Sequence, residues 1–483
     1  MGFPLGAPGE RAYTARMRLF DTLSREARLL APLDGRTFRF YCCGPTVYGP
    51  AHIGNFRTFV MQDVMRRALE TGGMPTLHVR NITDVDDKTI RDSQAGGEKL
   101  EDFTKRWTER FHADCEKLNL LPPHIEPGAV EHIPQQIAMI EALVEKGHEY
   151  QSEDGSVYFR IASFPGYGKL SRLDARELEL GKTQNTRASS DEYEKDGLAD
   201  FVLWKARRPE DGENFWPSPW GEGRPGWHLE CSAMIREYLG DSFDLHSGGV
   251  DLVFPHHENE IAQSRCACGG DFSAHWFHVT HLVVDGRKMA KSLGNLYTLD
   301  DLAERGFSAM ETRYVLIGAH YRKPLNFTIA SLEAAQEALA KLAKGVRQLA
   351  AKVPEGTMLK SAEFGPFQTA WDALNDDLNT PGALGGLFTG LRDAVKLEGE
   401  AAAEALAGCN RMLKALGLVL PEVIDHAETE VPEEIRELAE RRWAARQAKD
   451  WGTSDAMRDE LASLGWAVKD GKDGYVLTPA SGS

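Results

Sequence analysis

Long apolar runs are what the 483-residue sequence most plainly lacks. No stretch approaches the roughly 20 consecutive apolar residues that a helix needs to cross a bilayer. The first residues lack the charged-then-apolar pattern of a secretory signal, and Met1-Gly2 is not followed by the hydroxyl residue of a myristoylation site. We therefore expect a cytoplasmic protein that does not enter a membrane.

Cysteines are also few. The seven cysteines are irregularly spaced and odd in number, so the disulfide framework of a small secreted domain is not expected. Internal repeats and low-complexity tracts are missing as well. Hydrophobic residues make up 42% of the chain and charged residues 27%, which is typical of a globular protein. The length predicts two to four domains.

Basic residues are in deficit. The chain has 56 Lys and Arg against 73 Asp and Glu, for a formal net charge of −17. This balance argues weakly against a nucleic-acid partner, but such binding depends on a local basic face rather than on the whole chain. A nucleic-acid contact would therefore be confined to part of the surface.

The stretch from Thr37 to Thr58 predicts a strand, a turn and a helix. Thr37–Cys43 alternates like a strand, Gly44-Pro45 ends it, and from Phe56 apolar residues recur at helical spacing up to Gly72-Gly73. Open α/β sheets hold ligands at such turns, and helix N-termini favour anions. His52-Ile53-Gly54-Asn55 lies there. A helix cap or a packed histidine remains the alternative to a binding site.

A second stretch, Lys288-Met289-Ala290-Lys291-Ser292, lies far downstream in an expected loop. Two lysines three residues apart, next to a hydroxyl, suit a polyphosphate whose charge must be neutralised as it moves. A solvated loop is the alternative for this pattern taken alone.

The order of the expected elements predicts the fold class. A strand at Phe243–His246, a loop at Ser247–Asp251 and a helix at Phe254–Cys266 form a second half after an insertion at about 90–206. Two such halves fit an α/β domain with a doubly wound parallel (Rossmann-like) sheet. A helical bundle and a small C-terminal α+β domain follow. The expected boundaries are a loose extension at 1–16, the α/β domain at 17–326, the bundle at 327–419, a linker at 420–432 and the last domain at 433–483.

Pro255–Glu260 indicates part of a metal site, because it opens an expected helix with two histidines and two glutamates. Residues four apart share a helix face, so His256 lies beneath Glu260. His257 is expected to face the same way as the apolar Ile261. The pair that can share a metal is therefore His256 with Glu260.

Two cysteines can complete a tetrahedral site with this pair. Cys43 ends the first strand, and Cys231 stands at a helix start in the second half. Cys42 should point to the opposite side of the sheet from Cys43. Cys266-x-Cys268 lacks the usual gap of two to four residues between paired zinc ligands. Buried cysteines and a capped histidine remain the alternative to a four-ligand site.

The two signatures and the metal pattern, in this order, resemble one family. His52–Asn55 and Lys288–Ser292 resemble the HIGH and KMSKS signatures of class I aminoacyl-tRNA synthetases, and the chain from about Leu19 to Val476 resembles the cysteinyl-tRNA synthetases. The segments that carry the resemblance are Cys43–Tyr48, His52–Asn55, Asn81–Asp87, Gly226–Met234, Asp251–Ser264, Lys288–Asn295 and Ala445–Leu461. Asn55 and Ala290 depart from the signatures, and neither change is expected to remove activity.

The resemblance implies a zinc site. In this family zinc takes the thiolate of the substrate, and a soft metal prefers a thiolate to the hydroxyl of serine. The implied zinc ligands are Cys43, Cys231, His256 and Glu260. The residues implied to line the amino-acid pocket are Thr46, Trp227, His246 and Asp251, although each also fits an ordinary turn or packing role.

The resemblance also implies a nucleotide site and a two-step reaction. L-Cysteine reacts with ATP to give cysteinyl-adenylate and then passes to the 3′ end of tRNA(Cys). The residues implied to bind ATP, together with Mg²⁺, are His52, Gly54, Asn55, Lys288 and Lys291, and all but Gly54 are implied to act in catalysis. The region at about 275–326 would carry the KMSKS loop. Such chemistry needs positioning and charge stabilisation rather than a nucleophilic side chain.

The C-terminal domain at 433–483 is implied to bind the anticodon. Its basic cluster, which also fits a solvated helix face, consists of Arg441, Arg442, Arg446 and Lys449. The expected partners are L-cysteine, ATP and tRNA(Cys), and a monomer is expected. One alternative is an ATP-dependent ligase that joins cysteine to an amino sugar in the mycothiol pathway, against which the C-terminal domain argues. The other is a zinc-stabilised RNA-binding protein without catalysis, against which the lysines of the Lys288–Ser292 loop argue.

Overall fold

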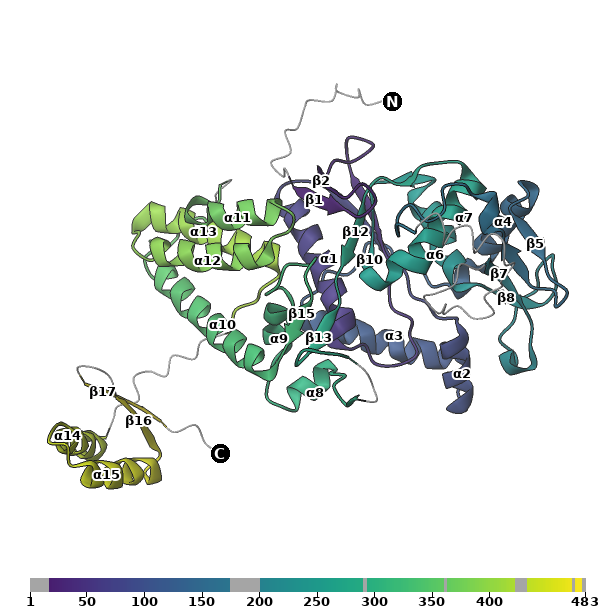
Figure 1. Ribbon diagram of the computed structural model, residues 1–483. Coiled ribbons are helices and arrows are strands. Elements are labelled where there is room, and N and C mark those ends of the chain that lie inside the picture. The colour runs from purple at the N-terminus through teal and green to yellow at the C-terminus, as the bar shows by residue number, and fades with distance from the viewer. Residues whose placement is uncertain are drawn as a thin grey trace. The chain divides into compact units, whose positions relative to one another are not determined.

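A computed structural model describes residues 17–173, 200–289, 293–359, 363–421, 432–470 and 474–479 of the chain. The chain divides after Pro421 into two compact units, whose elements are labelled in Figure 1. The expected extension at 1–16 and most of the expected linker at 420–432 lie outside the described residues. No helix among the described residues combines the length and the apolar character that crossing a bilayer requires.

The first unit is built on a four-stranded sheet in the order β12-β10-β3-β4 (Figure 1). Its strands are β3 (Phe38–Cys42), β4 (Thr76–Arg80), β10 (Leu245–Gly249) and β12 (Trp276–Val279). Every neighbouring pair is parallel. The chain runs from β3 to β4 on one side and later returns to β10 on the other side of β3. This is the doubly wound arrangement that the sequence predicts, and the prediction is confirmed.

Helices cover both faces of this sheet. Helix α1 (Ile53–Thr71) packs on the face that carries Cys42. Helices α6 (Trp227–Leu239) and α7 (Glu258–Cys268) pack on the face that carries Cys43. Successive side chains of a strand point to opposite faces, so the two adjacent cysteines separate as the sequence predicts.

Helix α1 begins at a cap formed by the His52–Asn55 turn. The Asn55 N–H donates to His52 Nδ1 at 3.2 Å, and the His52 N–H donates to Asn55 Oδ1 at 3.0 Å. These reciprocal bonds satisfy backbone donors that a helix start leaves unpaired. Gly72 closes the other end, as predicted. The cap fixes the direction of the His52 ring at the carboxyl end of the sheet.

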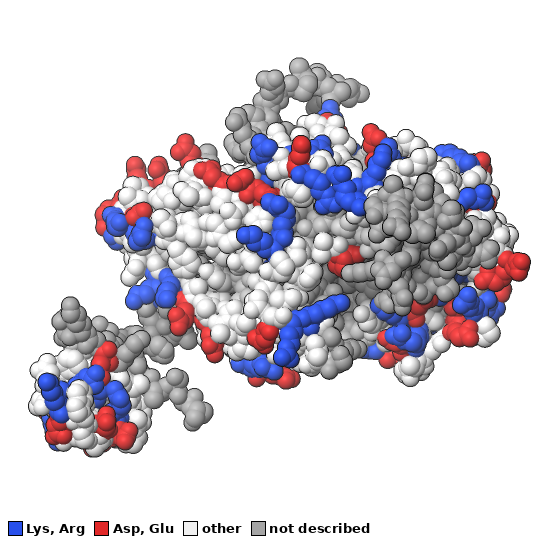
Figure 2. All heavy atoms as spheres, in the orientation of Figure 1, with Lys and Arg blue, Asp and Glu red and all other residues white. Residues whose placement is uncertain are grey.

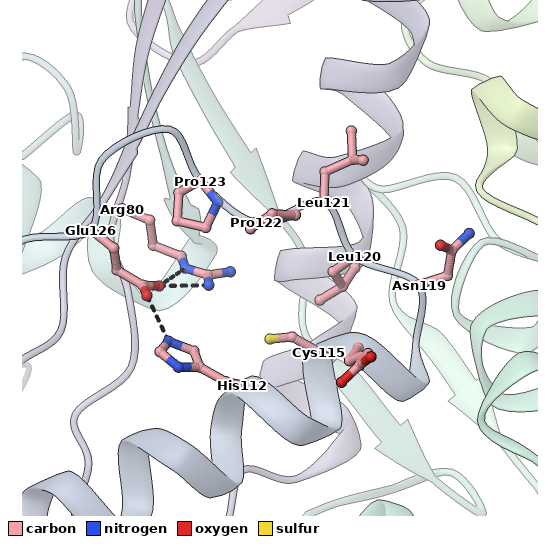
Figure 3. Close-up of a pocket in the computed structure, with 10 residues that line it drawn as sticks. Arg80, His112, Cys115, Asn119, Leu120, Leu121, Pro122, Pro123 and Glu126 are labelled. Carbon is pink, nitrogen blue, oxygen red and sulfur yellow. Dashed lines mark hydrogen bonds and ion pairs between the residues drawn. The ribbon is translucent and has the colours of Figure 1, made fainter.

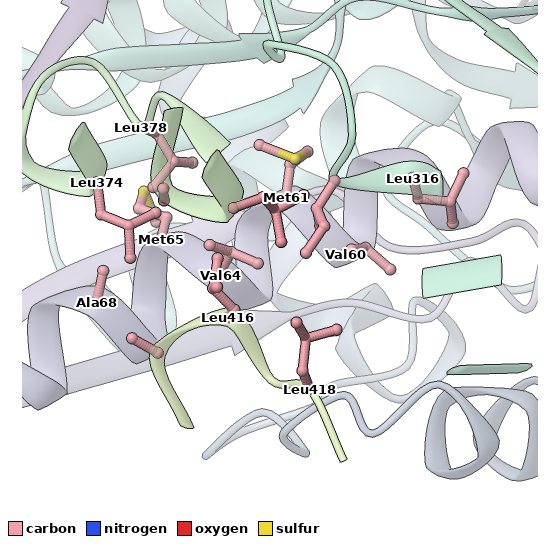
Figure 4. Close-up of a cluster of buried hydrophobic side chains, with 14 of the residues drawn as sticks. Val60, Met61, Val64, Met65, Ala68, Leu316, Leu374, Leu378, Leu416 and Leu418 are labelled. Carbon is pink, nitrogen blue, oxygen red and sulfur yellow. The ribbon is translucent and has the colours of Figure 1, made fainter. Parts of the chain in front are cut away.

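The helical bundle continues the core of the sheet domain. Its helices are α10 (Ile329–Ala350), α11 (Gln368–Asn375), α12 (Thr380–Ala394) and α13 (Gly399–Leu416). Figure 4 shows α1 side chains such as Val64 and Ala68 beside leucines of the bundle, among them Leu374 and Leu416. A fully buried leucine contributes roughly 1.5–3 kcal/mol, so this shared cluster holds the bundle firmly against α1.

The insertion contains its own antiparallel sheet, in the order β5-β6-β7-β8. The strands are β5 (Glu149–Gln151), β6 (Val157–Phe159), β7 (Phe201–Ala206) and β8 (Gly223–Pro225). Its helices are α2 (Asp87–Ala95), α3 (Leu100–Lys117) and α4 (Ile133–Glu145). Because β8 pairs with β7, the insertion extends to Pro225, past its expected end near residue 206.

A small sheet supports the Lys288 loop. Its strands are β13 (Leu282–Val284), β14 (Arg287–Lys288) and β15 (Leu325–Phe327), with helices α8 (Leu299–Ala303) and α9 (Ala309–Leu316) between them in the chain. Two further strand pairs in this unit are β1 (Arg18–Asp21) with β2 (Glu26–Leu29), and β9 (Ser242–Phe243) with β11 (Phe272–Ser273). Residue Lys288 thus ends the second strand of a hairpin that is anchored to β15.

The second unit is a helical pair with a hairpin. It comprises α14 (Glu433–Gln447), α15 (Trp451–Ser463) and the antiparallel strands β16 (Trp466–Asp470) and β17 (Tyr475–Pro479). Buried residues at helical spacing on α14 meet α15 and β16 in a separate core. The described residues therefore give this unit the α+β character that the sequence predicts.

A buried arginine joins α1 to the segments that lead to the Lys288 hairpin. Arg57 is fully buried and donates to four backbone carbonyls. The acceptors are Thr280 at 2.9 Å, Leu316 at 3.1 Å, His320 at 3.2 Å and Lys323 at 2.8 Å. Burial lowers the pKa of Arg57 to about 10, so the side chain stays charged at neutral pH. The His52 turn and the support of the Lys288 hairpin are therefore fixed to each other.

A second buried arginine, Arg313, leads to a prediction about stability. Arg313 is fully buried, and its Nη2 lies 2.5 Å from Asp63 Oδ2, which also accepts from Arg67 at 2.8 Å. In an Arg313→Gln variant one partner of a buried pair is lost, and we expect the free energy of unfolding to fall by about 3 kcal/mol in urea titrations. Arg392→Gln removes an exposed arginine and should change it by less than about 0.5 kcal/mol. Equal effects of the two changes would contradict the prediction.

Candidate metal and nucleotide site

Four predicted ligands meet at the carboxyl end of the sheet. Cys43 follows β3, and Cys231 lies in the second turn of α6. His256 lies in the turn at Val253–His257 just before α7, and Glu260 lies in the first turn of α7. All four are buried, and one ligand atom of each lies within 4.8 Å of the others. His256 Nε2 lies 3.0 Å from Glu260 Oε1, as their spacing predicts. The structure therefore brings together residues that are up to 217 positions apart in the chain.

A glycine allows Cys43 to reach this position. The Gly44 N–H donates to Asn81 Oδ1 at 2.8 Å, and a Cβ built on Gly44 would lie 1.6 Å from the Asn81 carbonyl oxygen. No other residue type fits such a close approach between the ends of β3 and β4. Asn81 Oδ1 also lies 3.9 Å from Cys231 Sγ. The same amide therefore contacts the segments that carry both cysteines.

His257 also enters the cluster, contrary to the expectation from helix faces. Its Nε2 lies 3.3 Å from Cys43 Sγ, and a second set of four mutually close donors consists of Cys43, His246, His257 and Glu260. The physical reason is local backbone geometry. Phe254 has extended dihedrals (φ −139°, ψ 134°), and regular α-helix starts only at Glu258. The i,i+4 rule therefore does not fix the direction of His257.

The charges in the cluster favour a metal with soft ligands. Burial raises the pKa of Cys231, but the hydrogen bond with Cys43 and the nearby His256 outweigh burial and lower that pKa to about 6. Burial opposes charge on His256, yet Glu260 raises its pKa to about 10. Burial also opposes charge on Glu260, yet His246 and His256 lower its pKa to about 2. The cluster thus holds Cys231 and Glu260 toward their anionic, metal-binding forms, and a metal would take the place of the proton on His256.

Histidines around the cluster orient its members. His228 Nδ1 lies 2.9 Å from His256 Nδ1, and His278 Nε2 lies 2.7 Å from His257 Nδ1. Hydrogen bonds of this kind set which nitrogen of a histidine faces a metal. Sequence reasoning missed both His228 and His278, because their only signal was an unusual number of histidines in this half of the chain.

Of the four residues expected in the amino-acid pocket, two contact the candidate metal ligands directly and two do not. The Trp227 ring stacks on His256 with 4.4 Å between ring centroids. His246 Nε2 lies 2.8 Å from Glu260 Oε2. Thr46 is half-buried and pairs with Thr83 through the backbone. Asp251 is exposed, in a turn at Val250–Leu252. The structure thus groups Trp227 and His246 directly with the cluster.

The two signature stretches also come together. A Cβ built on Gly54 would lie 3.0 Å from the His52 ring and 3.3 Å from Met289 Sδ, so Met289 lies against the His52–Asn55 turn. The Ile53 N–H donates to the Tyr297 carbonyl at 2.9 Å. Lys288 is exposed at the end of β14, whereas Ala290, Lys291 and Ser292 lie outside the described residues. An exposed amine and a helix start therefore share one region, which suits a polyphosphate.

A separate pocket of about 420 Å³ lies between α3 and the end of β4 (Figure 3). Arg80 Nη2 lies 2.6 Å from Glu126 Oε1, and His112 Nε2 lies 2.6 Å from Glu126 Oε2. The charges at this end of the pocket are thus already matched. No residue predicted for the site lines it, so we do not assign it a role.

Comparisons with known proteins agree with this geometry. Residues 29–337 match the family model described as the tRNA synthetases class I (C) catalytic domain. Residues 371–422 match the DALR domain, and residues 428–475 match the cysteinyl-tRNA ligase anticodon binding domain. These three matches follow the order of the sheet domain, the bundle and the second unit.

Whole-chain relatives share one name. The chain is 54% identical to a cysteine–tRNA ligase of Opitutus terrae over 96% of this chain and 99% of that protein. It is 43% identical to a cysteine–tRNA ligase of Chlamydia caviae over 95% of this chain and 97% of that protein. Methionyl-tRNA synthetase of Mycobacterium tuberculosis, solved with methionyl-adenylate, shares the fold with a TM-score of 0.57 at 14% identity, covering 79% of this chain and 90% of that one. By sequence over its full length, the chain belongs to the cysteine–tRNA ligase family of class I aminoacyl-tRNA synthetases.

Proposed function

We propose that this chain activates L-cysteine with ATP to cysteinyl-adenylate and transfers the cysteine to the 3′ end of tRNA(Cys). The observation that carries the proposal is the buried cluster of Cys43, Cys231, His256 and Glu260 at the carboxyl end of β3. It lies in the same domain as the His52 turn that Met289 contacts. A site for a thiol and a site for a polyphosphate thus stand at one end of one sheet.

The metal proposed for the cluster is zinc. Two sulfurs, one imidazole nitrogen and one carboxylate oxygen within 4.8 Å form a donor set that suits zinc better than hard cations such as magnesium. When bound, zinc supplies a soft Lewis acid that prefers the thiolate of cysteine to the hydroxyl of serine. Size alone would separate these two substrates by only about 1–3 kcal/mol.

The chain's own residues provide position and charge for adenylation. His52, Gly54 and Asn55 are proposed to hold ATP at the start of α1, where backbone N–H groups favour phosphate. Lys288 and Lys291 are proposed to neutralise the β- and γ-phosphates with Mg²⁺ as the cysteine carboxylate attacks the α-phosphate and pyrophosphate leaves. No nucleophilic side chain is needed, because the substrate carboxylate is the nucleophile.

The amino-acid pocket is proposed to include Thr46, Trp227, His246 and Asp251. The ring of Trp227 covers one side of His256 and would limit the space beside the thiol. His246 holds Glu260 by one ring nitrogen, while its Nδ1 is buried without a hydrogen-bond partner among the described residues. Such a nitrogen can accept or donate to a polar substrate group. These contacts favour Trp227 and His246 as the nearer pocket residues.

The second unit is proposed to bind the anticodon. Trp451 is 54% exposed, and the Arg446 guanidinium lies over its ring at 5.4 Å. An exposed aromatic ring beside an arginine is a platform on which a nucleobase can stack. Arg442 has a different role from the one that its charge indicates. It is fully buried and forms two bonds to Asp470, at 2.7 and 2.8 Å, so it stabilises the unit.

This assignment predicts an effect on tRNA alone. Trp451→Ala should raise the KM for tRNA about tenfold, because stacking of one base contributes about 1–3 kcal/mol. Pyrophosphate exchange measured without tRNA should not change. Leu464→Ala, a change at a similarly exposed residue of the same unit (53%), is the control and should alter neither quantity. An unchanged KM in the Trp451 variant would remove this residue from the tRNA surface.

The test of the overall function has two stages. The purified protein should catalyse ATP–pyrophosphate exchange only with cysteine, and serine should be at least about 10⁴-fold poorer. It should then charge tRNA with cysteine in the presence of Mg²⁺. Product formation with an amino sugar, without charging of tRNA, would favour the sugar ligase instead, but the anticodon domain and the full-length relatives do not support that alternative. We also propose that the enzyme acts in the cytoplasm and is a monomer. Size-exclusion chromatography of the purified protein checks the oligomeric state.

A further inference from the structure

Two arginines from different segments of the first unit each donate a hydrogen bond to the backbone of the other's turn. Arg25 lies between β1 and β2, and Arg172 lies in a turn of the insertion. Arg25 Nη2 donates to the Leu170 carbonyl at 3.0 Å, and Arg172 Nη2 donates to the Leu23 carbonyl at 3.2 Å. The crossed bonds hold the two side chains together. Within the described residues, neither guanidinium forms a salt bridge.

No carboxylate of the described residues forms an ion pair with either arginine. Asp21 attracts Arg25, but its carboxylate already pairs with Arg28 at 3.2 Å and accepts the Trp276 N–H at 2.9 Å. Burial and the positive charge of Arg172 lower the pKa of Arg25. Two like charges held close together repel, and an anion bound by both would relieve that repulsion. Among the described residues this is a cationic pair without an ion-pair partner, in a chain whose net charge is −17.

The backbone at both arginines is held in an uncommon conformation. The φ angle is 66° at Arg25 and 61° at Arg172, in the left-handed region that residues with a Cβ rarely adopt. The backbone of each turn therefore holds a defined conformation at its arginine. Figure 2 shows Lys and Arg side chains gathered over the region of the β1–β2 hairpin.

The turn of Arg25 is connected to the candidate metal cluster by hydrogen-bonded side chains. Thr22 Oγ1 lies 2.7 Å from His278 Nδ1, and His278 Nε2 lies 2.7 Å from His257 Nδ1. His257 Nε2 in turn lies 3.3 Å from Cys43 Sγ. Arg25 is only three positions after Thr22 in the chain, so this chain of hydrogen bonds links its turn to the expected amino-acid site.

The turn of Arg172 is connected to the same cluster through α7. The Glu258 carboxylate accepts the N–H of Gly168 at 2.8 Å and the N–H of Ser171 at 2.9 Å. Glu258 lies one residue before Asn259, which accepts a hydrogen bond from the Tyr167 hydroxyl. Leu170, between these contacts, is buried in the apolar cluster that contains Cys43 and Cys231. Both turns are therefore fixed to the walls of the site.

We propose that Arg25 and Arg172 together bind a phosphate of the 3′-terminal strand of tRNA where it approaches the amino-acid site. The inference rests on the proposed function, because transfer requires the tRNA end to reach the adenylate. The phosphates of ATP are assigned to the His52 turn and the Lys288 hairpin, on the side of α1. The arginine pair lies on the side of α7 and β12, so the polyanion left for it is the tRNA strand. Guanidinium groups bind phosphate through paired N–H donors.

Charge-removing variants test the pair. Arg25→Met, Arg172→Met and the double variant should weaken tRNA binding and reduce its dependence on salt. Each neutralised phosphate of a single strand contributes about 0.7 to the slope of log affinity against log salt, so the double variant, which frees one phosphate, should lose about 0.7. Cysteine-dependent pyrophosphate exchange without tRNA should stay within about twofold of the wild type, since the lost charge acts only on tRNA.

Charge-retaining and distant variants are the controls. Arg25→Lys and Arg172→Lys should keep most of the salt slope, because a phosphate contact of this kind is mainly electrostatic. Arg236→Met removes an arginine of α6 that pairs with Asp241, and it should leave the salt slope unchanged. If the double variant folds poorly, the single methionine variants still decide the question, because each should lower the slope relative to its lysine counterpart.

Three results would overturn the proposal. The methionine variants could keep the wild-type slope, which would mean that no phosphate binds there. They could raise the KM for ATP in the exchange reaction, which would assign the pair to the nucleotide. They could lower exchange as much as charging, which would make the pair part of the site's framework. Failure of the wild type to charge tRNA in the same assay would instead reject the proposed function.

Discussion

Replacing Cys231 by alanine should abolish the proposed zinc binding and lower cysteine-dependent pyrophosphate exchange at least about 100-fold. Loss of a residue that only orients a metal ligand already lowers affinity or activity about 10–100-fold. His256→Ala should have the same effects as the change of Cys231. Both residues belong to one of two overlapping donor sets, and the other set uses His246 and His257 in their place. Metal content measured on purified protein, together with exchange rates, separates the two sets.

We expect His246→Ala and His257→Ala to retain one zinc per chain with weaker affinity. The reason is that His246 is already bonded to Glu260 and His257 to His278, so each fits the role of orienting a ligand. Cys266→Ser, at a buried cysteine of the insertion-side core, is the control and should keep both zinc and activity. Loss of zinc from the His257 variant, with full retention in the Cys231 variant, would reverse the assignment.

Replacing Lys291 by alanine should lower the rate of adenylation about 100-fold while the KM for cysteine changes little. Its positive charge is proposed to act on the leaving pyrophosphate, so its loss affects the transition state more than substrate binding. Lys288→Ala should act in the same direction. Steady-state exchange at varied cysteine and ATP gives both constants.

The matched control for the lysines is Arg287→Ala. Arg287 is also exposed on β14, but successive residues of a strand point to opposite sides. Its removal should leave the rate of adenylation unchanged. If Lys288 and Lys291 behaved like Arg287, the segment would be a solvated turn and the phosphates would be neutralised elsewhere.

Local signals were sufficient to predict the framework of the site. The turn after β3 and the cap of α1 follow from short patterns in the sequence, and so does the opposite orientation of Cys42 and Cys43. Because ligands gather at the carboxyl ends of parallel strands, distant donors such as Cys43 and Cys231 could be placed together. Their assignment as zinc ligands stays a prediction.

What the sequence did not predict depends on backbone details and on long-range pairing. The place of His257 beside Cys43 was not predicted, because the helix was assumed to be regular from Pro255, whereas regular helix starts at Glu258. The end of the insertion was misplaced because three residues, Gly223–Pro225, form β8 only by pairing with β7. Such short strands carry no period that a sequence pattern can detect.

Arg442 shows that a positive charge alone does not identify a residue of a basic surface. It follows Ile435 and Leu438 at helical spacing, so it lies on the buried side of α14. Its pairing with Asp470 was not visible, because the partner comes from a strand of the hairpin. A cationic residue that keeps the spacing of an apolar face is therefore better interpreted as a buried partner than as part of a basic surface.

The bonds of Arg57 have a consequence for how this fold can diverge. Its acceptors at Thr280, Leu316, His320 and Lys323 are all main-chain carbonyls, which every amino acid possesses. Substitutions at those four positions leave the acceptors in place, whereas a change of Arg57 removes all four bonds at once. Selection would therefore act on one codon without a correlated change at any other. Methods that infer contacts from paired substitutions would not detect this junction, even in a deep collection of diverged sequences.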